Sequence, residues 1–234
     1  GFIEQRRERR FREPLEGRTY KTALPVKLTR EQKLSLEAIV EMLDKPYVNP
    51  RAILLYGVTG SGKTEVYLDS VQHCLEQGKK ALVLVPEIAL TPQTIERFAS
   101  RFPGEIAVMH SGLSLGERFD QWWRIRDGEY GVVIGARGAV FAPQPDLGLV
   151  VIDEEHEWTY KQNESNPKYH ARDVVMQLAG ITRAAVILGS ASPDIESYLR
   201  ARRERYRFAK LTERFLPEAR LQHSEAMGDL ASVK

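Results

Sequence analysis

The sequence contains a single cysteine, Cys74, among its 234 residues. One cysteine excludes a disulfide framework within the chain, and it also excludes a zinc site built from cysteines. The five histidines are dispersed and do not have the spacing of metal ligands. We therefore expect no zinc ligand set in this chain.

Long hydrophobic runs are also missing. The longest apolar stretches, such as residues 52–56 and 81–85, have the length of strands and are too short to span a membrane as helices. The N-terminus is rich in arginine and has no apolar stretch behind it, which is unlike a signal peptide. With the lone cysteine, these features predict a cytoplasmic protein that does not contact a membrane.

A strong excess of one charge is absent from the whole chain but present at one end. The chain has 34 Lys and Arg and 32 Asp and Glu, and nine of the basic residues against four Glu lie in residues 1–30. A basic arm is able to contact nucleic acid, and a solvated linker has the same composition, so both interpretations stay open. We assign residues 1–27 to this arm. Because the chain begins at Gly1 and not at Met, it is compatible with a piece of a longer protein.

Short apolar runs alternate with amphipathic segments along the rest of the chain. Strands are predicted at residues 52–56, 81–85, 106–110, 131–135, 147–153 and 185–190. Helices are predicted at residues 28–43, with Thr29 as the N-cap, and at 63–78, 92–102, 115–128 and 169–180. Continuously apolar strands separated by helices indicate a mainly parallel sheet covered on both faces. The sequence therefore predicts a three-layer α/β fold for residues 28–220, followed by a polar tail at 221–234.

A phosphate-binding loop follows the first predicted strand. Its sequence GVTGSGKT matches the pattern G-x-x-x-x-G-K-[ST] and stands between a strand and a helix, as that loop requires. Its backbone N–H groups and the helix N-terminus suit the phosphates of ATP, Lys63 is expected to reach the β- and γ-phosphates, and the Thr64 hydroxyl is expected to bind Mg²⁺. The predicted ATP-binding residues of the loop are Gly57, Val58, Thr59, Gly60, Ser61, Gly62, Lys63 and Thr64.

An acidic cluster follows the fifth predicted strand, in the sequence LVVIDEEHEW. Asp153 stands at the carboxyl end of an apolar run, where P-loop enzymes place their second Mg²⁺ partner. Glu154 is then suited to orient or deprotonate the attacking water. An acidic helix start is the alternative for such a cluster, and the phosphate loop in the same chain favours the catalytic interpretation.

Aromatic and basic side chains are interleaved directly after the acidic cluster, in EHEWTYKQNESNPKYHARD. Such a pattern is typical of a stacking platform for unpaired bases, although Trp158 packed on the sheet is an alternative. We also expect Arg172 to face nucleic acid. The residues predicted to contact DNA in this segment are Trp158, Tyr160, Lys161 and Tyr169.

Seven motifs together resemble one family. In chain order they are GVTGSGKTEVY, VPEIALTPQ, HSGLS, GARGAVFAP, VVIDEEHEWTYKQ, YHARDVV and LGSASP. They are similar to the first RecA-like motor lobe of the replication-restart primosomal helicases (the PriA family, or primosomal protein N′) of helicase superfamily 2. The resemblance covers about residues 28–220. It implies an ATP-dependent DNA helicase that moves 3′ to 5′ and acts at forked DNA in replication restart and primosome assembly.

The resemblance also implies roles for single residues. Gln32 corresponds to a glutamine that reads adenine, and Thr91 and Arg137 to residues that grip DNA phosphates. His156, Ser190 and Ser192 correspond to residues that couple the nucleotide state to strand movement.

The resemblance further implies parts and partners beyond this chain. Expected partners are single-stranded and forked DNA, primosome proteins and single-strand-binding proteins. ATP and Mg²⁺ are the expected cofactors, and zinc is expected only in a cysteine-rich part of the full-length family. We expect a second motor lobe to follow the tail.

Two alternatives to a DNA motor stay open. One is a nucleotide-binding primosome scaffold that has lost turnover, and the other is an RNA-remodelling ATPase. The intact set of Lys63, Thr64, Asp153 and Glu154 argues against the scaffold. The sequence Asp-Glu-Glu-His with its aromatic segment, in place of Asp-Glu-Ala-Asp, argues against the RNA enzyme.

Overall fold

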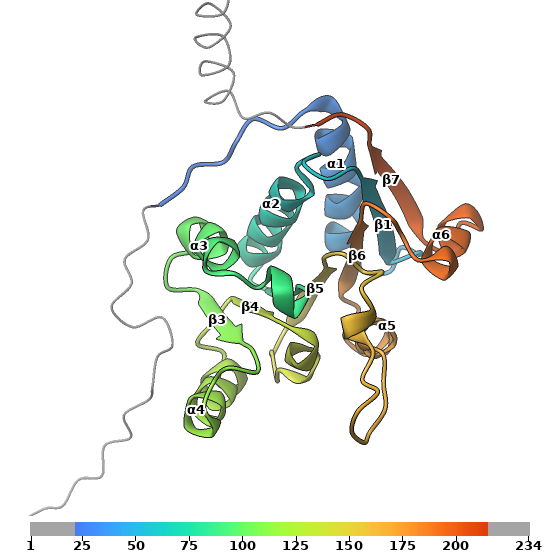
Figure 1. Ribbon diagram of the computed structural model, residues 1–234. Helices are drawn as coiled ribbons and strands as arrows, with labels where there is room; N and C mark the ends of the chain where they lie inside the picture. Colours follow the sequence, from blue (N-terminus) through green and yellow to red (C-terminus); the bar gives the residue numbers. More distant parts are fainter. Residues whose placement is uncertain (1–21, 215–234) are drawn as a thin grey trace, which may run out of the picture.

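The computed structural model describes residues 22–214 (Figure 1). Residues 22–29, the end of the predicted basic arm and the residues that lead into the first helix, contain no helix or strand. The rest of the arm and the polar tail at 221–234 lie outside the described residues. The boundaries predicted for the lobe, 28 and 220, therefore stay predictions.

A single sheet of parallel strands forms the centre of the described chain. Its strands follow the order β3-β4-β2-β5-β6-β1-β7. All neighbouring pairs are parallel. The strands are β1 (Ala52–Gly57), β2 (Lys80–Leu84), β3 (Ile106–Met109), β4 (Val132–Gly135), β5 (Leu147–Ile152), β6 (Ala185–Ser190) and β7 (Arg207–Leu211).

Helices cover both faces of this sheet (Figure 1). The α-helices are α1 (Arg30–Asp44), α2 (Lys63–Glu76), α3 (Pro92–Arg101), α4 (Leu115–Arg126), α5 (Ala171–Thr182) and α6 (Ile195–Arg202). Short 3₁₀ turns are η1 (Glu87–Ala89), η2 (Arg137–Phe141) and η3 (Trp158–Tyr160). In the described part of the chain, none of these helices is long and apolar enough to cross a membrane.

The strands divide their side chains between two buried clusters. Ile53 and Leu55 of β1 join one cluster with side chains of α1, α2 and α3. Ala52 and Leu54 of the same strand join the other, with side chains of α4, α5 and α6. This alternation is what a strand buried on both faces requires. The predicted three-layer α/β fold is confirmed.

Two elements were not predicted from the sequence. The helix α6 is eight residues long and polar, and only Ser197 and Ala201 are buried in it. The strand β7 is short and lies at the edge of the sheet, where Phe208 and Lys210 are left exposed. Neither segment has the continuous apolar run that marks the central strands, so hydrophobic pattern alone does not reveal them.

The strand order brings the candidate motifs together. Ligands of parallel α/β sheets bind at the carboxyl ends of the strands. In the sheet, β6 lies between β1 and β5. Three segments therefore lie side by side at this edge: the phosphate loop after β1, the LGSASP segment at the end of β6 and the acidic cluster after β5. The segments that follow β2, β3 and β4 lie on the other half of the same edge.

Candidate active site and nucleic-acid interface

The phosphate loop connects β1 to α2. Gly60 and Gly62 have φ of 80° and 78°, a left-handed conformation that glycine adopts without strain. Lys63 is the first residue of α2, and its Nζ donates to the carbonyl oxygen of Gly57 over 2.9 Å. Ser61 Oγ is buried and has no hydrogen-bond partner in the described part of the chain. A loop with an unused buried hydroxyl and inward-curled backbone fits a bound phosphate group.

Asp153 stands directly after β5 and is held by two tyrosines. The Tyr67 hydroxyl of α2 donates to Asp153 Oδ1 over 2.9 Å, and the Tyr160 hydroxyl donates to the Asp153 carbonyl oxygen over 2.7 Å. Burial, followed by the nearby charge of Glu154, raises the pKa of the Asp153 carboxyl. A cation beside this carboxylate would offset both effects. The site therefore favours a positive ion next to Asp153.

Glu154 lies between the phosphate loop and the LGSASP segment. Its Oε1 is 3.7 Å from Lys63 Nζ, and its Oε2 is 3.6 Å from His156 Nδ1 and 3.5 Å from the backbone N–H of Ala191. Its φ is 45°, which is uncommon for a residue with a side chain and costs about 1–3 kcal/mol. The strained backbone aims this carboxylate at the phosphate loop, where a water-orienting group is required.

The donor set fits Mg²⁺ better than a metal held by protein alone. Among the described residues, no group of three or more His, Cys, Asp and Glu side chains could hold a metal ion. Mg²⁺ typically binds one or two carboxylates together with phosphates of the substrate. Asp153 supplies such a carboxylate, and Thr64 is the second residue of α2, next to the phosphate loop.

Gln32 joins the first helix to the phosphate loop. Thr29 is the N-cap of α1, as predicted. Gln32 completes a capping box, because its Oε1 accepts from the backbone N–H of Thr29 over 2.8 Å. The Gln32 Nε2 donates to the carbonyl oxygen of Ser61 over 2.9 Å, and the side chain is fully buried. Both ends of the amide are therefore already used. The adenine-reading role stays a prediction, and it requires these bonds to be exchanged.

The three predicted coupling residues are in direct contact. His156 Nδ1 lies 2.7 Å from Ser190 Oγ, and His156 Nε2 lies 3.2 Å from Ser192 Oγ. Ser190 is fully buried at the end of β6, and its Oγ also accepts from the Ser192 backbone N–H. One imidazole thus connects the acidic cluster to the segment that follows β6.

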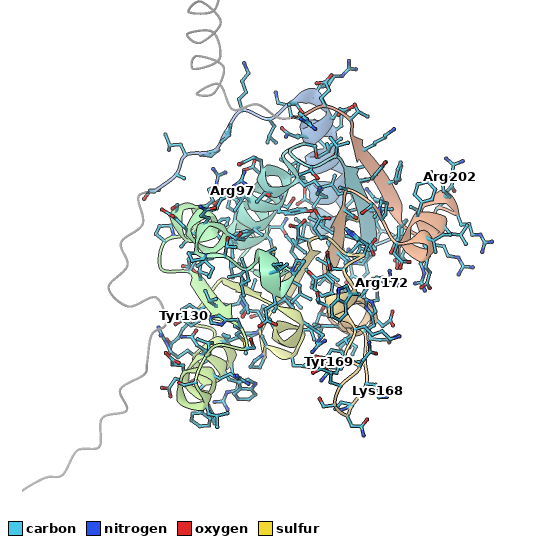
Figure 2. The ribbon with its side chains drawn as sticks, viewed as in Figure 1. Arg97, Tyr130, Lys168, Tyr169, Arg172 and Arg202 are labelled. Atoms are coloured by element: carbon cyan, nitrogen blue, oxygen red, sulfur yellow. The ribbon has the colours of Figure 1, made fainter. Side chains whose placement is uncertain are left out.

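Arg172 is not available to nucleic acid, so its expected role as a DNA contact is wrong. Its Nη1 donates to Glu155 Oε2 over 3.1 Å and to Ser197 Oγ over 2.9 Å, and its Nη2 donates to Glu196 Oε2 over 3.1 Å. The Glu155 side chain is fully buried. Figure 2 shows Arg172 at the start of α5, set back from Lys168 on the neighbouring loop.

This ion network joins three functional segments. Glu155 belongs to the acidic cluster, and its Oε1 also accepts from the backbone N–H of Asp194, just before α6. Arg172 follows the aromatic segment, and Ser197 follows LGSASP. Glu155 and Arg172 therefore bind the three segments to one another.

A cavity of about 500 Å³ lies on the other half of the carboxyl edge. It is lined by residues that follow β2, β3 and β4, among them Glu87 and His110, and by the aromatic segment. Trp158 lines it with 77% of its surface exposed. Tyr169 also lines it and packs edge-on against Phe141, with ring centroids 5.0 Å apart. Trp158 is thus exposed at this cavity, whereas Tyr169 is partly buried against the core. Their stacking on bases stays a prediction.

Arg137 fixes one end of the aromatic segment. Its Nη1 donates to the carbonyl oxygens of Thr159 and Lys161, over 3.0 and 2.8 Å. Lys161 is exposed and lines the cavity. Arg137 therefore positions the segment, and its predicted grip on a DNA phosphate stays a prediction.

Two other predicted DNA contacts have structural roles. Tyr160 is 1% exposed and donates to the Asp153 backbone, so the prediction that its ring stacks on a base is wrong. A buried tyrosine at this position instead joins the aromatic segment to the acidic cluster. Thr91 is the N-cap of α3, and its Oγ1 accepts from the backbone N–H of Thr94. Its contact with DNA stays a prediction.

The sequence patterns did not reveal the residues that hold the predicted site residues in place. Tyr67 and Glu155 belong to motifs that were recognised, but no pattern indicates that one supports Asp153 and the other binds Arg172. The two partners of each pair are 86 and 17 residues apart in the chain. Only the strand order brings them together.

The chain matches the model of the DEAD/DEAH box helicase family over residues 29–200. It is 46% identical to the replication restart protein PriA of Bacillus subtilis (strain 168) over 225 residues, which cover 94% of this chain and 28% of that protein. It is 47% identical to the protein of the same name from Synechocystis over 171 residues, which cover 73% of this chain and 20% of the relative. The chain thus spans less than a third of the length of these curated relatives.

Solved helicase structures have the same fold. One is RecG bound to a three-way DNA junction, with a TM-score of 0.57 and 24% identity, where the match covers 83% of this chain and 25% of that one. Another is the DUF1998 helicase MrfA bound to DNA, with a TM-score of 0.55 and 17% identity, covering 85% of this chain and 32% of that one. The fold is that of a RecA-like helicase lobe.

Proposed function

Because the chain belongs to the DEAD/DEAH box helicase family, we propose that it is the first motor lobe of an ATP-dependent DNA helicase that acts in replication restart. The observation that carries this proposal is the contact chain from Lys63 through Glu154 and His156 to Ser190 and Ser192. It joins the phosphate loop to the segments that would sense DNA. The relatives named PriA support the replication-restart role.

In this function the nucleotide binds at the carboxyl ends of β1, β6 and β5. The phosphate loop and Lys63 hold the phosphates, and the Thr64 hydroxyl and Asp153 carboxylate hold Mg²⁺, which supplies charge neutralisation to the phosphates. Glu154 orients the attacking water and accepts its proton. His156 contacts Glu154, Ser190 and Ser192, so a shift of the Glu154 side chain displaces the two serines through the imidazole.

DNA is the proposed strand substrate, bound across the cavity beside Trp158. The structural neighbours RecG and MrfA are described as bound to DNA, which supports this assignment. Movement from 3′ to 5′, action at forks, contacts with primosome and single-strand-binding proteins, and zinc elsewhere in the longer protein follow from the likeness to the PriA family. They are proposals for the whole protein.

A scaffold without turnover and an RNA-remodelling ATPase are less well supported. The scaffold has no need for a strained Glu154 backbone that aims a carboxylate at the phosphate loop. The aromatic segment, with Trp158 exposed above a cavity, suits unpaired bases, and the structural neighbours RecG and MrfA are described as bound to DNA. A comparison of DNA and RNA as stimulators of ATP hydrolysis separates all three functions.

The nucleotide site is tested by Lys63→Ala. We expect the affinity for Mg²⁺-ATP to fall by roughly 10- to 100-fold, the worth of a hydrogen bond to a charged group. Lys63 is 8% exposed, so the thermal unfolding temperature is measured alongside to separate binding from folding. Titration calorimetry on the folded variant gives the affinity. An unchanged affinity would remove this loop as the ATP site.

Tyr67→Phe tests whether the tyrosine positions Asp153. The substitution removes only the hydroxyl that donates to Asp153 Oδ1. We expect kcat for ATP hydrolysis by the longer protein to fall by roughly 10- to 100-fold, with a higher Mg²⁺ concentration at half-saturation. Because phenylalanine keeps the ring in the core, we expect the unfolding temperature of the variant to stay close to that of the parent. Measuring this temperature is the control for folding. A normal kcat with a normal Mg²⁺ dependence contradicts the positioning role.

Trp158→Ala tests the stacking platform. In the longer protein we expect DNA-stimulated ATP hydrolysis to fall far more than basal hydrolysis, because a lost stacked base costs about 1–3 kcal/mol. Since Trp158 is 77% exposed, we expect the variant to stay folded. Trp158→Phe is the matched control, and it should keep most of the stimulation. If basal and stimulated rates decline in parallel, or if the variant melts early, Trp158 is a packing residue.

A further inference from the structure

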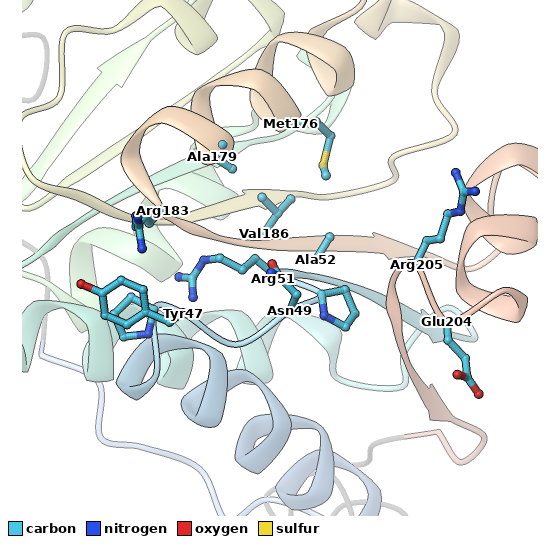
Figure 3. A pocket seen from close by; sticks show the side chains of 13 residues that line it. Tyr47, Asn49, Arg51, Ala52, Met176, Ala179, Arg183, Val186, Glu204 and Arg205 are labelled. Carbon is cyan, nitrogen blue, oxygen red and sulfur yellow. The ribbon is translucent and has the colours of Figure 1, made fainter.

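A second cavity lies at the opposite end of the strands from the candidate active site. Its volume is about 760 Å³, and it is lined where β1 and β6 begin, by Ala52 and Val186, and by Met176 and Ala179 of α5. Figure 3 shows these four small or apolar side chains as the floor of the cavity. None of the residues proposed for ATP or for DNA lines it.

Three arginines surround this floor without acidic partners. No ion pair with a residue of the described part of the chain is formed by any of the three, which are Arg51, Arg183 and Arg205. Arg51 donates to the backbone carbonyl oxygens of Met42, Lys45 and Ala184, which leaves its Nη2 without a partner there. Burial, and then the charge of Arg183, lowers the pKa of Arg51, as expected for cations that repel each other. The cavity therefore has an unbalanced positive charge.

The one carboxylate of the lining does not neutralise these arginines. Figure 3 shows the Glu204 side chain pointing away from the floor and from Arg205. Glu204 and Arg183 both have left-handed backbones, with φ of 58° and 61°. Glycine or asparagine is usual at such positions, and a longer side chain there costs about 1–2 kcal/mol. The chain thus places an arginine where a stable fold prefers glycine.

An exposed aromatic ring completes the lining. Tyr47 is 80% exposed, and the Arg183 guanidinium lies 4.6 Å from the centre of its ring. Arg183 makes no hydrogen bond or ion pair with the described residues, so its N–H groups are free to donate. At the far end of the floor, Arg205 supplies the third cation of the lining (Figure 3).

We propose that this cavity binds a nucleotide unit of single-stranded nucleic acid, with its base over the apolar floor beside Tyr47 and its phosphates on Arg51, Arg183 and Arg205. Guanidinium groups match phosphate oxygens in a bidentate way, and aromatic rings accept the face of any base. The volume is in the range of small-ligand cavities. The contact is separate from the ATP site and from the Trp158 cavity, so it stands or fails independently of the motor function.

An acidic peptide fits these residues less well. Extended peptides typically gain affinity by pairing with an exposed strand edge. The lining residues of this cavity belong to turns, helix α5 and the starts of two central strands, and none belongs to the edge strands β3 or β7. A nucleotide needs only cations and a flat surface, and both are present.

The experiment is photocrosslinking of this chain to oligothymidylate that carries 5-iodouracil, in about 0.15 M salt, where weak surface attraction is screened. Mass spectrometry locates the crosslinked residues. We expect a crosslink at Tyr47, and its yield against oligonucleotide concentration gives the affinity of this site alone. Crosslinks at Trp158 report the motor interface separately. Absence of a Tyr47 crosslink would overturn the proposal, whatever happens at Trp158.

Charge reversal gives the second readout. We expect Arg183→Glu and Arg205→Glu each to weaken the Tyr47 crosslink by at least about tenfold and to lower the salt dependence of its affinity by about one phosphate contact. Arg202→Glu is the matched control, because Arg202 is an exposed arginine of α6 outside the lining (Figure 2). Equal effects of all three variants would mean that only general charge attracts the strand, and the proposal would be wrong.

Competitors identify the source of the nucleotide. Loss of the crosslink in the presence of thymidine monophosphate would support the site and assign it to free mononucleotides. Competition by unlabelled oligothymidylate alone would support the site and assign it to a strand. Competition by polyglutamate as strong as that by oligothymidylate would assign the cavity to an acidic peptide and overturn the proposal.

Discussion

Replacement of Arg172 by methionine is expected to lower the free energy of unfolding by about 3–5 kcal/mol. The substitution keeps much of the side-chain volume but leaves Glu155, whose side chain is fully buried, without its cation. An uncompensated buried charge is among the most costly single changes in a protein. Denaturant titration of the variant and of the parent chain measures the difference.

A double-mutant cycle separates this pair from a general loss of packing. The combination of Arg172→Met with Glu155→Gln should recover part of the lost stability, because no buried charge remains unpaired. Lys45→Met is the control, since it breaks an exposed pair with Glu41 that is expected to contribute less than about 1 kcal/mol. If the two single variants and the double variant show additive losses, Glu155 and Arg172 do not depend on each other.

The network also matters for the motor because of the segments it joins. Glu155 follows Glu154, the proposed water-orienting residue, and Arg172 follows the aromatic segment that carries Trp158. Ser197 follows the coupling residues, and its hydroxyl donates to Glu155 Oε2 over 2.8 Å. A buried ion network is rigid only when every member is satisfied. Here each member has a partner, so the network holds the three segments in one arrangement.

The fold was largely predictable because its central strands are buried on both faces. Continuous apolar runs such as residues 52–56 have few alternatives in a soluble chain, and four predicted helices separate them. The eight-residue helix α6 and the edge strand β7 have half-exposed, charged sequences. Their conformation depends on the elements that they pack against; β7, for example, pairs with β1. The local sequence does not indicate which element a segment will pair with.

The candidate site was predictable where chemistry fixes both residue type and spacing. Lys63 and Thr64 must follow a glycine-rich turn, and Asp153 must stand at a strand end, so pattern alone located them. Tyr160 shows the limit of pattern. Its sequence neighbours are aromatic and basic, but its ring turns inward and its hydroxyl binds the Asp153 backbone. Alternation of exposed and buried side chains within a three-residue turn cannot be inferred from composition.

Hydrolysis of ATP by this chain alone is expected to be at least about a thousandfold slower than by a version extended to the length of its relatives. Transfer of a phosphoryl group needs positive charge on the side of the γ-phosphate opposite the phosphate loop, and an arginine finger commonly supplies it. A missing finger costs about 10³–10⁵ in turnover. The resemblance to the PriA family implies that this finger belongs to a second lobe.

The arginines considered at this edge do not replace it. Arg172 is committed to Glu155, Ser197 and Glu196, and Arg137 donates to the backbone of the aromatic segment. Moving Arg172 to the nucleotide would leave Glu155 buried without a cation, at the cost argued above. The resemblance to the PriA family implies that DNA acts by bringing a second lobe onto the nucleotide. We therefore expect single-stranded DNA not to accelerate hydrolysis by residues 1–234 on their own.

The measurement is steady-state phosphate release by the short and the extended chain, each with and without single-stranded DNA. Glu154→Gln in the extended chain gives the rate that remains when the water is no longer activated, and the short chain should be close to it. DNA-stimulated turnover by the short chain at the rate of the extended one would mean that it supplies its own finger, within one molecule or across a dimer. The two-lobe requirement would then be wrong, while the binding roles of Lys63 and Asp153 would stand, because they depend only on this edge of the sheet.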